Sequence, residues 1–386
     1  MSTPSAHIVG VGETARIRHP APAQTTLTLM RDAALAAMGD AGLGLPDIDG
    51  LAVASFSLAP DRAVDVAWRL GLSVRWLLQD ENGGASTISM LGHALNAIAA
   101  GAASNILVLG GDVTGAQDFV GRVMRFNSAT RDHLAPLDYG GPNALFAMLT
   151  RRQMRRFGLA RTDYGHLAIA QRQWAAGNPL AAYRTPLTMD DYLNAPMVAE
   201  PLGCFDCVPV VAGASALIVS TGARDGAAGA PVRILALRQN INADHQDGDG
   251  LETGIRDVAA ELWRAVGIGP TDMDLASVYD DYPAMAYAQL ADLGLIAGDD
   301  IARFAREVMA QRRFPVNTGG GLLSCGQAGC ASGLHGVIEV ARQLQHRGGE
   351  RQVAGAKLGV ATGYGMALYR YGACAGAVVL ARAGEG

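Results

Sequence analysis

The sequence predicts an α/β protein in which buried strands alternate with helices. Short apolar stretches such as residues 105–110 (NILVLG) have the length and composition of buried strands. Between them, residues 26–42 and 86–100 carry apolar side chains at helical spacing. The chain has 386 residues, 49% hydrophobic and 17% charged, which is enough for a large core. Such alternation favours a mostly parallel sheet covered by helices.

The elements follow in order along the chain. Residues 125–201 interrupt the alternation, because they are richer in Arg, Tyr, Asn and Pro. This composition predicts an inserted helical region with loops. Residues 222–231, rich in Gly and Ala, predict a linker. The expected strands are 6–10, 48–54, 105–110, 214–220, 232–236, 275–279, 358–362 and 375–381, and the expected helices are 26–42, 86–100, 254–266 and 336–344.

The two halves of the chain resemble each other. Gly84-Ala85-Ser86 opens a helix followed by a strand, and Cys330-Ala331-Ser332 does the same later. We therefore expect a duplicated architecture with an N-terminal half at 1–225, including the helical region 125–201, and a C-terminal half at 232–386. Helices related in this way would direct two positive dipole ends at one site.

Composition excludes several classes of function. The formal net charge of −5 gives no basic footprint for nucleic acid. Five cysteines, an odd number, favour reduced thiols and a cytoplasmic location. No stretch approaches the 18 or so apolar residues of a membrane span, and the N-terminus lacks the pattern of a signal peptide.

Residues 316–336 (VNTGGGLLSCGQAGCASGLHG) predict a site. Glycine at this density suits tight turns and close backbone approach. A glycine-rich loop that opens into a helix also presents backbone N–H groups to a developing negative charge. We expect Gly320 and Gly326 of this loop to contact a bound substrate.

Several segments, in order along nearly the whole chain, resemble the thiolase superfamily and most closely its sterol-carrier-protein-x or lipid-transfer branch. They are residues 81–111, 172–207, 278–283 (VYDDYP), 316–329 and 363–366 (GYGM). The resemblance implies a five-layered αβαβα body with residues 125–201 as a cap, and an acyl-coenzyme A thioester as substrate. It also implies a homodimer formed through the strand near Asn105, and a possible small zinc-ribbon/OB-fold partner protein.

The residues that perform thiolase chemistry are missing at the matching positions. Glycine, Gly84, stands where relatives have the nucleophilic cysteine, and Gln327 stands where they have the catalytic histidine. No cysteine lies in residues 362–366, where relatives have a second one. An amide cannot take a proton from a thiol at working pH. Gly84 would leave room for an acyl group or substrate tail.

Three residues are candidates for moving a proton. Tyr364 lies between two glycines after a predicted strand, and its phenol can donate or accept a proton; the alternative is a packed tyrosine. Asp281 and Tyr282 follow another strand. Because side chains alternate along an extended chain, one of Asp280 and Asp281 should enter the site and the other cap the helix at Pro283.

Other candidates would bind rather than react. Gln327 and Asn317 could hold a thioester oxygen, or could simply hydrogen-bond within their loops. Arg155, with three neighbouring arginines, could bind the phosphates of coenzyme A or form a solvated helix face.

The cysteines are weaker candidates for a nucleophile or a metal site. Cys330 opens a predicted helix, which lowers the pKa of a thiol, so it is a candidate nucleophile; a small buried filler is the alternative. Cys204 and Cys207 form a lone C-x-x-C without histidines, and we expect no metal site.

Three hypotheses follow. The first is an enzyme that makes or breaks a C–C bond through a thioester enolate, as a retro-aldolase does, without a cysteine acyl-enzyme. The second is a non-catalytic subunit that binds acyl-CoA or lipid and acts as a scaffold. The third is an acetyl-CoA acyltransferase that uses another cysteine.

Overall fold

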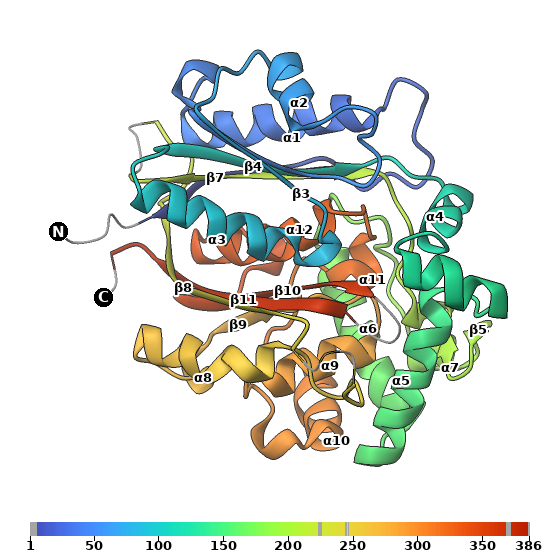
Figure 1. The fold of residues 1–386 in the computed structure, drawn as a ribbon. Helices are drawn as coiled ribbons and strands as arrows, with labels where there is room; N and C mark the ends of the chain where they lie inside the picture. The colour runs from blue at the N-terminus through green and yellow to red at the C-terminus, as the bar shows by residue number, and fades with distance from the viewer. Residues whose placement is uncertain (1–5, 223–225, 244, 246, 368–371, 385–386) are drawn as a thin grey trace.

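The computed structural model describes residues 6–222, 226–243, 245, 247–367 and 372–384, and these form five layers (Figure 1). Helices α1 (Thr26–Ala41) and α2 (Ala63–Leu70) cover the first sheet. Helices α3 (Ser86–Ala99) and α12 (Ala331–Leu344) lie between the two sheets. Helices α8 (Ile255–Val266) and α9 (Pro283–Asp292) cover the second sheet. This confirms the expected αβαβα body.

The strands form two sheets joined at one edge. The first has the order β3-β2-β4-β7-β1 and the second β8-β11-β10-β9. Antiparallel pairing of His7 and Ile8 with Arg233 and Val232 joins them. The strand bounds are β1 His7–Glu13, β2 Gly50–Ala54, β3 Trp76–Asp80, β4 Asn105–Asp112, β7 Gly213–Ser220, β8 Val232–Ile241, β9 Leu275–Ser277, β10 Leu358–Ala367 and β11 Gly372–Arg382.

The expectation of a mostly parallel sheet is wrong. Among the named strands in the described part of the chain, parallel pairing is confined to β3-β2-β4 and to β9-β10. The pairs β4-β7, β7-β1, β1-β8, β8-β11 and β11-β10 are antiparallel. In the second sheet β11 follows β10 after only a few residues, and so short a connection permits only an antiparallel neighbour. The apolar composition of these strands reflects burial on both faces, not parallel pairing.

The two halves repeat the same topology, as the sequence predicted. Helix α3 precedes the central strand β4, and α12 precedes the corresponding strand β10. The isolated parallel bridge between Ala276 and Val316 occupies the place in the second sheet that β3 has in the first. The strand orders therefore correspond position by position around β1 and β8. The boundaries at 225 and 232 stay predictions, and residues 223–225 lie outside the described part of the chain.

The helical region forms a cap at one end of the strands of both sheets (Figure 1). It begins earlier than predicted, because α4 (Ala116–Val123) follows β4 almost directly. Its other elements are a π-helical turn at Thr130–Leu134, a 3-10 turn at Ala135–Leu137, α5 (Pro142–Phe157), α6 (Arg161–Ala176), α7 (Met189–Leu193), β5 (Met197–Ala199), β6 (Leu202–Gly203) and a 3-10 turn at Cys204–Asp206.

Short helical elements connect the layers. The functionally important ones are η2 (Gly83–Ala85), which precedes α3, and α11 (Gly321–Cys325) in the glycine-rich loop. The others are Leu45–Asp47, Pro270–Asp272, Ala297–Asp299, α10 (Ile301–Arg303), a π-helical turn at Phe304–Met309 and Gly349–Arg351. No helix in the described part of the chain is long and apolar enough to cross a membrane.

The strand near Asn105 cannot serve as a dimer edge. This strand, β4, is hydrogen-bonded to β2 on one side and to β7 on the other. Strand β3 is paired only with β2 among the described residues, so it is the outer strand of the first sheet. Edge-to-edge pairing of this strand with a second copy is therefore excluded, and the homodimer itself stays a prediction.

Candidate active site

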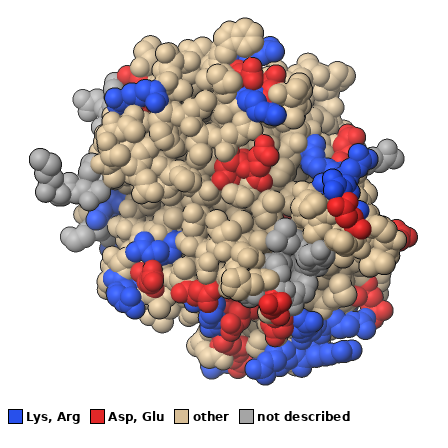
Figure 2. Space-filling view, viewed as in Figure 1, with Lys and Arg blue, Asp and Glu red and all other residues tan. Residues whose placement is uncertain are grey.

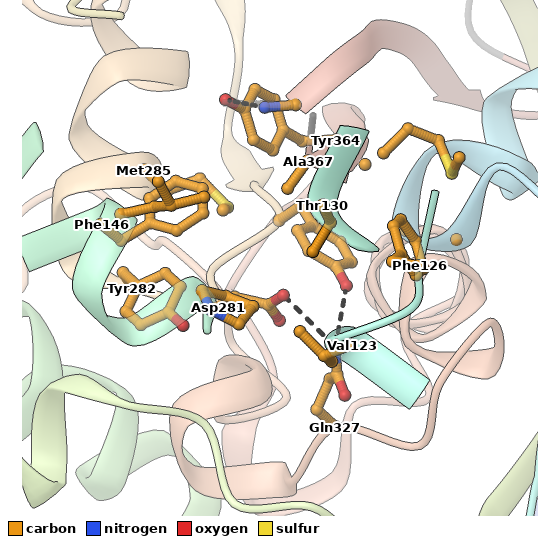
Figure 3. A pocket seen from close by; sticks show the side chains of 18 of the residues that line it. Val123, Phe126, Thr130, Phe146, Asp281, Tyr282, Met285, Gln327, Tyr364 and Ala367 are labelled. Carbon is orange, nitrogen blue, oxygen red and sulfur yellow. Dashed lines mark hydrogen bonds between the residues drawn. The ribbon is translucent and has the colours of Figure 1, made fainter. Parts of the chain in front are cut away.

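A small cavity lies where the cap meets the ends of the strands. Its volume is about 100 Å³, and most of its wall is apolar. The first half contributes η2 through Gly83 and Gly84, and the second half contributes Gln327, the loop after β9 and the end of β10. Cap residues from α4 to α5 close the remaining side (Figure 3). Both halves and the cap thus meet at one place.

Three polar side chains meet at this cavity. Asp281 comes from the loop after β9, and the Gln327 amide lies beside it (Figure 3). Gln327 Nε2 lies 3.3 Å from Asp281 Oδ2 and 3.4 Å from Tyr279 Oη, and it can donate to both. The amide therefore connects the carboxyl to the phenol.

Two buried oxygen atoms of residues that line this cavity have no hydrogen-bond partner among the described residues. They are Asp281 Oδ1 and Gln327 Oε1, and both are buried. An unpaired buried acceptor is costly, about 1–3 kcal/mol. A ligand that brings an O–H or N–H group to this end of the cavity would supply the missing donor.

The surroundings prepare these groups for proton transfer. Burial raises the pKa of Asp281 to about 7, and the Tyr279 and Gln327 side chains only partly offset this rise. Burial and the Asp281 charge raise the pKa of Tyr279 well above its usual value. Near neutral pH the carboxyl can therefore accept or release a proton, while the phenol stays protonated.

Tyr279 fills the space that a cysteine nucleophile would need. A Cβ atom on Gly84 would lie 2.2 Å from Tyr279 Cε2 and Cζ and 2.4 Å from the Tyr364 carbonyl oxygen. Glycine is therefore required at position 84. The expected room for an acyl group at Gly84 does not exist, because the aromatic ring occupies it.

The backbone of Tyr279 is held by a buried polar pair. Thr362 Oγ1 accepts the Tyr279 N–H at 3.0 Å and donates to Gln289 Oε1 at 2.6 Å. Gln289 Nε2 donates to the Tyr279 carbonyl at 2.6 Å. Strand β10 and helix α9 thereby fix the residue from both sides, which limits how far its ring can move.

The two adjacent aspartates do point in different directions, as predicted. Asp280, however, does not cap the helix at Pro283. Its carboxyl accepts the N–H of Leu322 at 2.9 and 3.0 Å and that of Leu323 at 3.3 Å, so it caps α11 in the glycine-rich loop. Burial raises its pKa to about 8. Asp280 shapes the loop, and Asp281 faces the cavity.

Tyr282 and Tyr364 line the cavity with their rings, and their hydroxyls are engaged elsewhere. Tyr282 donates to Asn143 Oδ1 at 2.8 Å, which joins the cap to the loop after β9. Tyr364 Oη accepts the Gly372 N–H at 2.8 Å and points away from Asp281 (Figure 3). A Cβ on Gly365 would lie 2.4 Å from the Asn82 carbonyl, so that glycine permits approach of η2.

The remaining predicted site residues lie outside the cavity wall. Asn317 is fully engaged with Val278, accepting its N–H at 2.7 Å and donating to its carbonyl at 3.0 Å. A Cβ on Gly320 would lie 2.6 Å from Ala175 Cβ, and one on Gly326 would lie 2.8 Å from Val211 side-chain atoms. These two glycines permit close packing of the loop.

Cys330 is buried behind the cavity. Its thiol is inaccessible, its N–H donates to Asp112 Oδ2 at 2.8 Å, and burial raises the pKa of the thiol well above its usual value. Low thiolate content and burial are the opposite of what a nucleophile needs. The described residues contain no cluster of His, Cys, Asp and Glu that could hold a metal ion.

Arg155 lies on the exposed face of α5. Figure 2 shows basic side chains gathered at the bottom of the molecule, over the end of this helix. Two of its neighbours are engaged: Arg151 pairs with Glu200 at 2.9 Å, and Arg152 donates to the Asp249 carbonyl. Phosphate binding by Arg155 stays a prediction.

Tyr279 was not predicted as a site residue from the sequence. It precedes the Asp-Asp pair in VYDDYP and was counted as the end of a strand. The available signal was complementarity: a glycine in place of the nucleophile leaves a void that some other side chain must fill, because protein interiors are close-packed.

Comparisons with known proteins show which family the chain resembles. A family model described as thiolase C-terminal domain-like matches residues 238–379. A 17-hydroxy-3-oxo-4-pregnene-20-carboxyl-CoA lyase from Mycobacterium tuberculosis is 32% identical over 89% of this chain and 92% of its own. A steroid side-chain-cleaving aldolase from Thermomonospora curvata is 29% identical over 88% and 90%.

The fold matches as well. A solved structure described as the Ltp2-ChsH2(DUF35) aldolase superposes with a TM-score of 0.80, covering 99% of both chains at 24% identity. These matches confirm the resemblance predicted from the sequence, and its lyase and aldolase relatives confirm that an enzyme was the right expectation. The chain belongs to the thiolase superfamily, in its lipid-transfer-type branch.

Proposed function

We propose that this protein is a β-hydroxyacyl-CoA aldolase, which cleaves the bond between the α- and β-carbons of the acyl group. The observation that carries the proposal is the unpaired Asp281 Oδ1 at the cavity, beside Gln327 and Tyr279 and opposite a position that has no nucleophile. Such a site can move protons, and it lacks the thiol needed for acyl transfer. The aldolase and lyase relatives support the same chemistry.

The reaction can be followed atom by atom. The substrate hydroxyl on the β-carbon donates to Asp281, which removes its proton. The bond between the α- and β-carbons then breaks, the β-carbon becomes a carbonyl, and the electron pair forms the thioester enolate. Tyr279 gives a proton to the α-carbon, and protonated Asp281 returns a proton to the phenol through the hydrogen bond between the two side chains. The products are an aldehyde or ketone and a shortened acyl-CoA, with no net oxidation.

The enolate oxygen needs donors at the same place. Gly84 lies in η2 directly before α3, and its N–H precedes the first hydrogen bond of this turn, which runs from Ala85 N to the Asn82 carbonyl. It lines the cavity beside Tyr279. We assign the thioester oxygen to this turn, because preorganised N–H groups stabilise a developing oxyanion strongly.

Two partners belong to the proposal. We propose a homodimer, with the edge strand β3 as the site of contact, since β3 pairs with β2 alone among the described residues. We also propose a small partner protein, because the structural neighbour is described as a complex with a DUF35 protein. We propose that the phosphates of coenzyme A bind at the basic end of α5, around Arg155.

The proposal is tested with purified protein, with and without its candidate partner, and a panel of β-hydroxyacyl-CoA thioesters. Release of an aldehyde or ketone is followed together with the shortened acyl-CoA. We expect both products in equal amounts and without added free coenzyme A. Binding of the thioesters without any carbonyl release would instead support the scaffold function.

A further inference from the structure

We propose that the β-carbon of the substrate carries a planar apolar group of about phenyl size, so that cleavage releases a small aromatic aldehyde or ketone. This inference rests on the proposed function and adds the class of substrate. It follows from three features of the cavity: the aromatic character of its wall, its size, and the position of its polar end.

Eight of the residues that line the cavity are aromatic. Phe146 stacks on Tyr282 with ring centroids 4.5 Å apart at an interplanar angle of 16°. Phe56 meets Phe126 edge to face at 5.5 Å. Figure 3 shows Phe146, Tyr282 and Met285 grouped on one side and Phe126 on the other. The full aromatic set is Phe56, Phe119, Phe126, Tyr139, Phe146, Tyr279, Tyr282 and Tyr364. Rings favour other rings in stacked and edge-to-face contacts.

The size of the cavity limits what can enter. Its volume is about 100 Å³. An engineered apolar cavity of about 150 Å³ binds benzene, so the space here is of the order of a single ring. A fused multi-ring skeleton is larger than the part of the cavity that the described residues enclose.

The wall is held in place by contacts that do not involve a ligand. Phe146 and Met285 are each only 3% exposed. The Tyr282 hydroxyl is fixed by Asn143, and Tyr279 is fixed through its backbone by Thr362 and Gln289. A wall of this kind resists expansion, because packed interiors have few low-energy alternatives.

The polar groups lie where such a substrate needs them. Asp281 and Gln327 line the cavity and each has an unpaired buried oxygen, while Phe146 and Tyr282 form the wall next to Asp281 (Figure 3). A β-hydroxyl donating to Asp281 would leave the ring on the same carbon against these aromatic side chains. An apolar ring at this carbon therefore satisfies the polar and the apolar parts of the cavity together.

The test is a series of substrates that differ only on the β-carbon. We would compare 3-hydroxybutyryl-CoA, 3-hydroxy-3-phenylpropionyl-CoA, its 2-naphthyl analogue and an analogue with a steroid-sized group, using the enzyme with its partner if one is required. The phenyl substrate should have the highest kcat/KM, about 10-fold above the methyl substrate and about 100-fold above the two larger ones. Equal or higher kcat/KM for the naphthyl or steroid-sized substrate overturns the inference and leaves the aldolase function intact.

A pair of matched variants tests the wall directly. Met285 and Met38 are both 3% exposed, but only Met285 lines the cavity. Met285→Ala should raise the ratio of kcat/KM for naphthyl over phenyl about 10-fold, whereas Met38→Ala should leave this ratio unchanged. The ratio is insensitive to a general loss of folded enzyme. An unchanged ratio in folded Met285→Ala contradicts the inference.

Failure of the aldolase function itself would be recognised separately. If none of the four thioesters releases an aldehyde or ketone, the proposed function is wrong. The size preference is then measured by calorimetry with the unreactive esters 3-phenylpropionyl-CoA and 3-(2-naphthyl)propionyl-CoA. Binding of the phenyl ester about 10-fold tighter than the naphthyl ester supports the inference, and equal or tighter naphthyl binding overturns it.

Discussion

Tyr279 and Gly84 form a complementary pair that separates this protein from thiolases that use a cysteine. The ring lies where a nucleophile would project, and glycine is the residue that allows it. The same ring brings its hydroxyl to Gln327 and Asp281. In the proposed mechanism this exchange removes a thiol and introduces a proton carrier.

The pair can be tested with Gly84→Ala. The added Cβ would collide with Tyr279 and with the Tyr364 carbonyl, so the variant should lose about 1–3 kcal/mol of unfolding free energy and most of its activity. Gly92→Ala in α3 is a suitable control, because its Cβ would meet only Leu237 Cδ2 at 3.5 Å. Chemical denaturation of both variants measures the difference. Equal stability of the two would show that Tyr279 does not fill this space.

Asp281 should give the reaction its pH dependence. Since burial raises the pKa of this carboxyl to about 7, the base form grows as pH rises through that value. We therefore expect kcat/KM to increase with pH and to level off above about 8. Measurement of kcat/KM from pH 5.5 to 9 checks this. A profile that is flat, or that falls through pH 7, would exclude Asp281 as the base.

At the scale of elements, the loop after β9 is the part that organises the site. It supplies Tyr279 and Asp281 to the cavity wall and Asp280 to the glycine-rich loop. Strand β10 and helix α9 hold it through Thr362 and Gln289. Positioning of the catalytic groups therefore depends on a polar contact buried between a strand and a helix.

Thr362→Val tests this contact without changing the shape of the side chain much. The Tyr279 N–H and Gln289 Oε1 would lose their partner, at a cost of about 2 kcal/mol in unfolding free energy. We expect kcat to fall more than KM rises, because the groups are misplaced and not removed. Thr362→Ser should restore both quantities. If Ser and Val behave alike, the hydroxyl has no positioning role.

The sequence predicts most elements at this scale, for identifiable reasons. Helices α1 and α3 and strands β4 and β7 have clear periodicity or continuous apolar composition, and their bounds differ from prediction by at most two residues. Strand β3 was missed because its residues are only partly buried. The direction of strand pairing was also wrong, since an apolar strand buried on both faces looks the same in either orientation.

The site was predicted less completely. Asp281 was predicted from its place after a strand and Gln327 and Gly84 through the resemblance, and the structure brings them to one cavity. The capping role of Asp280 and the contribution of Tyr279 depend on contacts between distant segments. Neither has a local pattern that could reveal it. Asn317, Gly320, Gly326 and Cys330 belong to the loops that build the site, and the wall of the cavity does not include them.

A buried ionic cluster joins the two halves of the molecule. Glu13 of β1 contacts Arg16 at 2.7 Å, His335 of α12 at 2.9 Å, and also Arg342. Its side chain is only 1% exposed. Burial alone would raise the pKa of Glu13, but His335, Arg342 and Arg16 together hold it well below its usual value. This cluster joins the first half to the central helix of the second.

Glu13→Gln should therefore destabilise the protein as a whole. Removal of one partner leaves buried cations without a counter-charge, which costs about 3–5 kcal/mol. Because the folded pKa of Glu13 is depressed, its contribution is complete above about pH 4.5 and is lost as pH falls below that value. The difference in unfolding free energy between wild type and variant should disappear in acid.

Glu307→Gln, at an exposed pair with Arg303, is the control and should change stability by less than about 1 kcal/mol. A similar loss in both variants would contradict the role of the cluster.

The central claim is that the molecule breaks a C–C bond by proton transfer at Asp281 and not by a cysteine. The most direct measurement is carbonyl release from one β-hydroxyacyl-CoA by wild type, Asp281→Asn and Cys330→Ala, each checked for folding. We predict that kcat falls by about 100-fold or more in Asp281→Asn and stays within about 3-fold of wild type in Cys330→Ala. Loss of activity in Cys330→Ala with activity retained in Asp281→Asn would contradict this account.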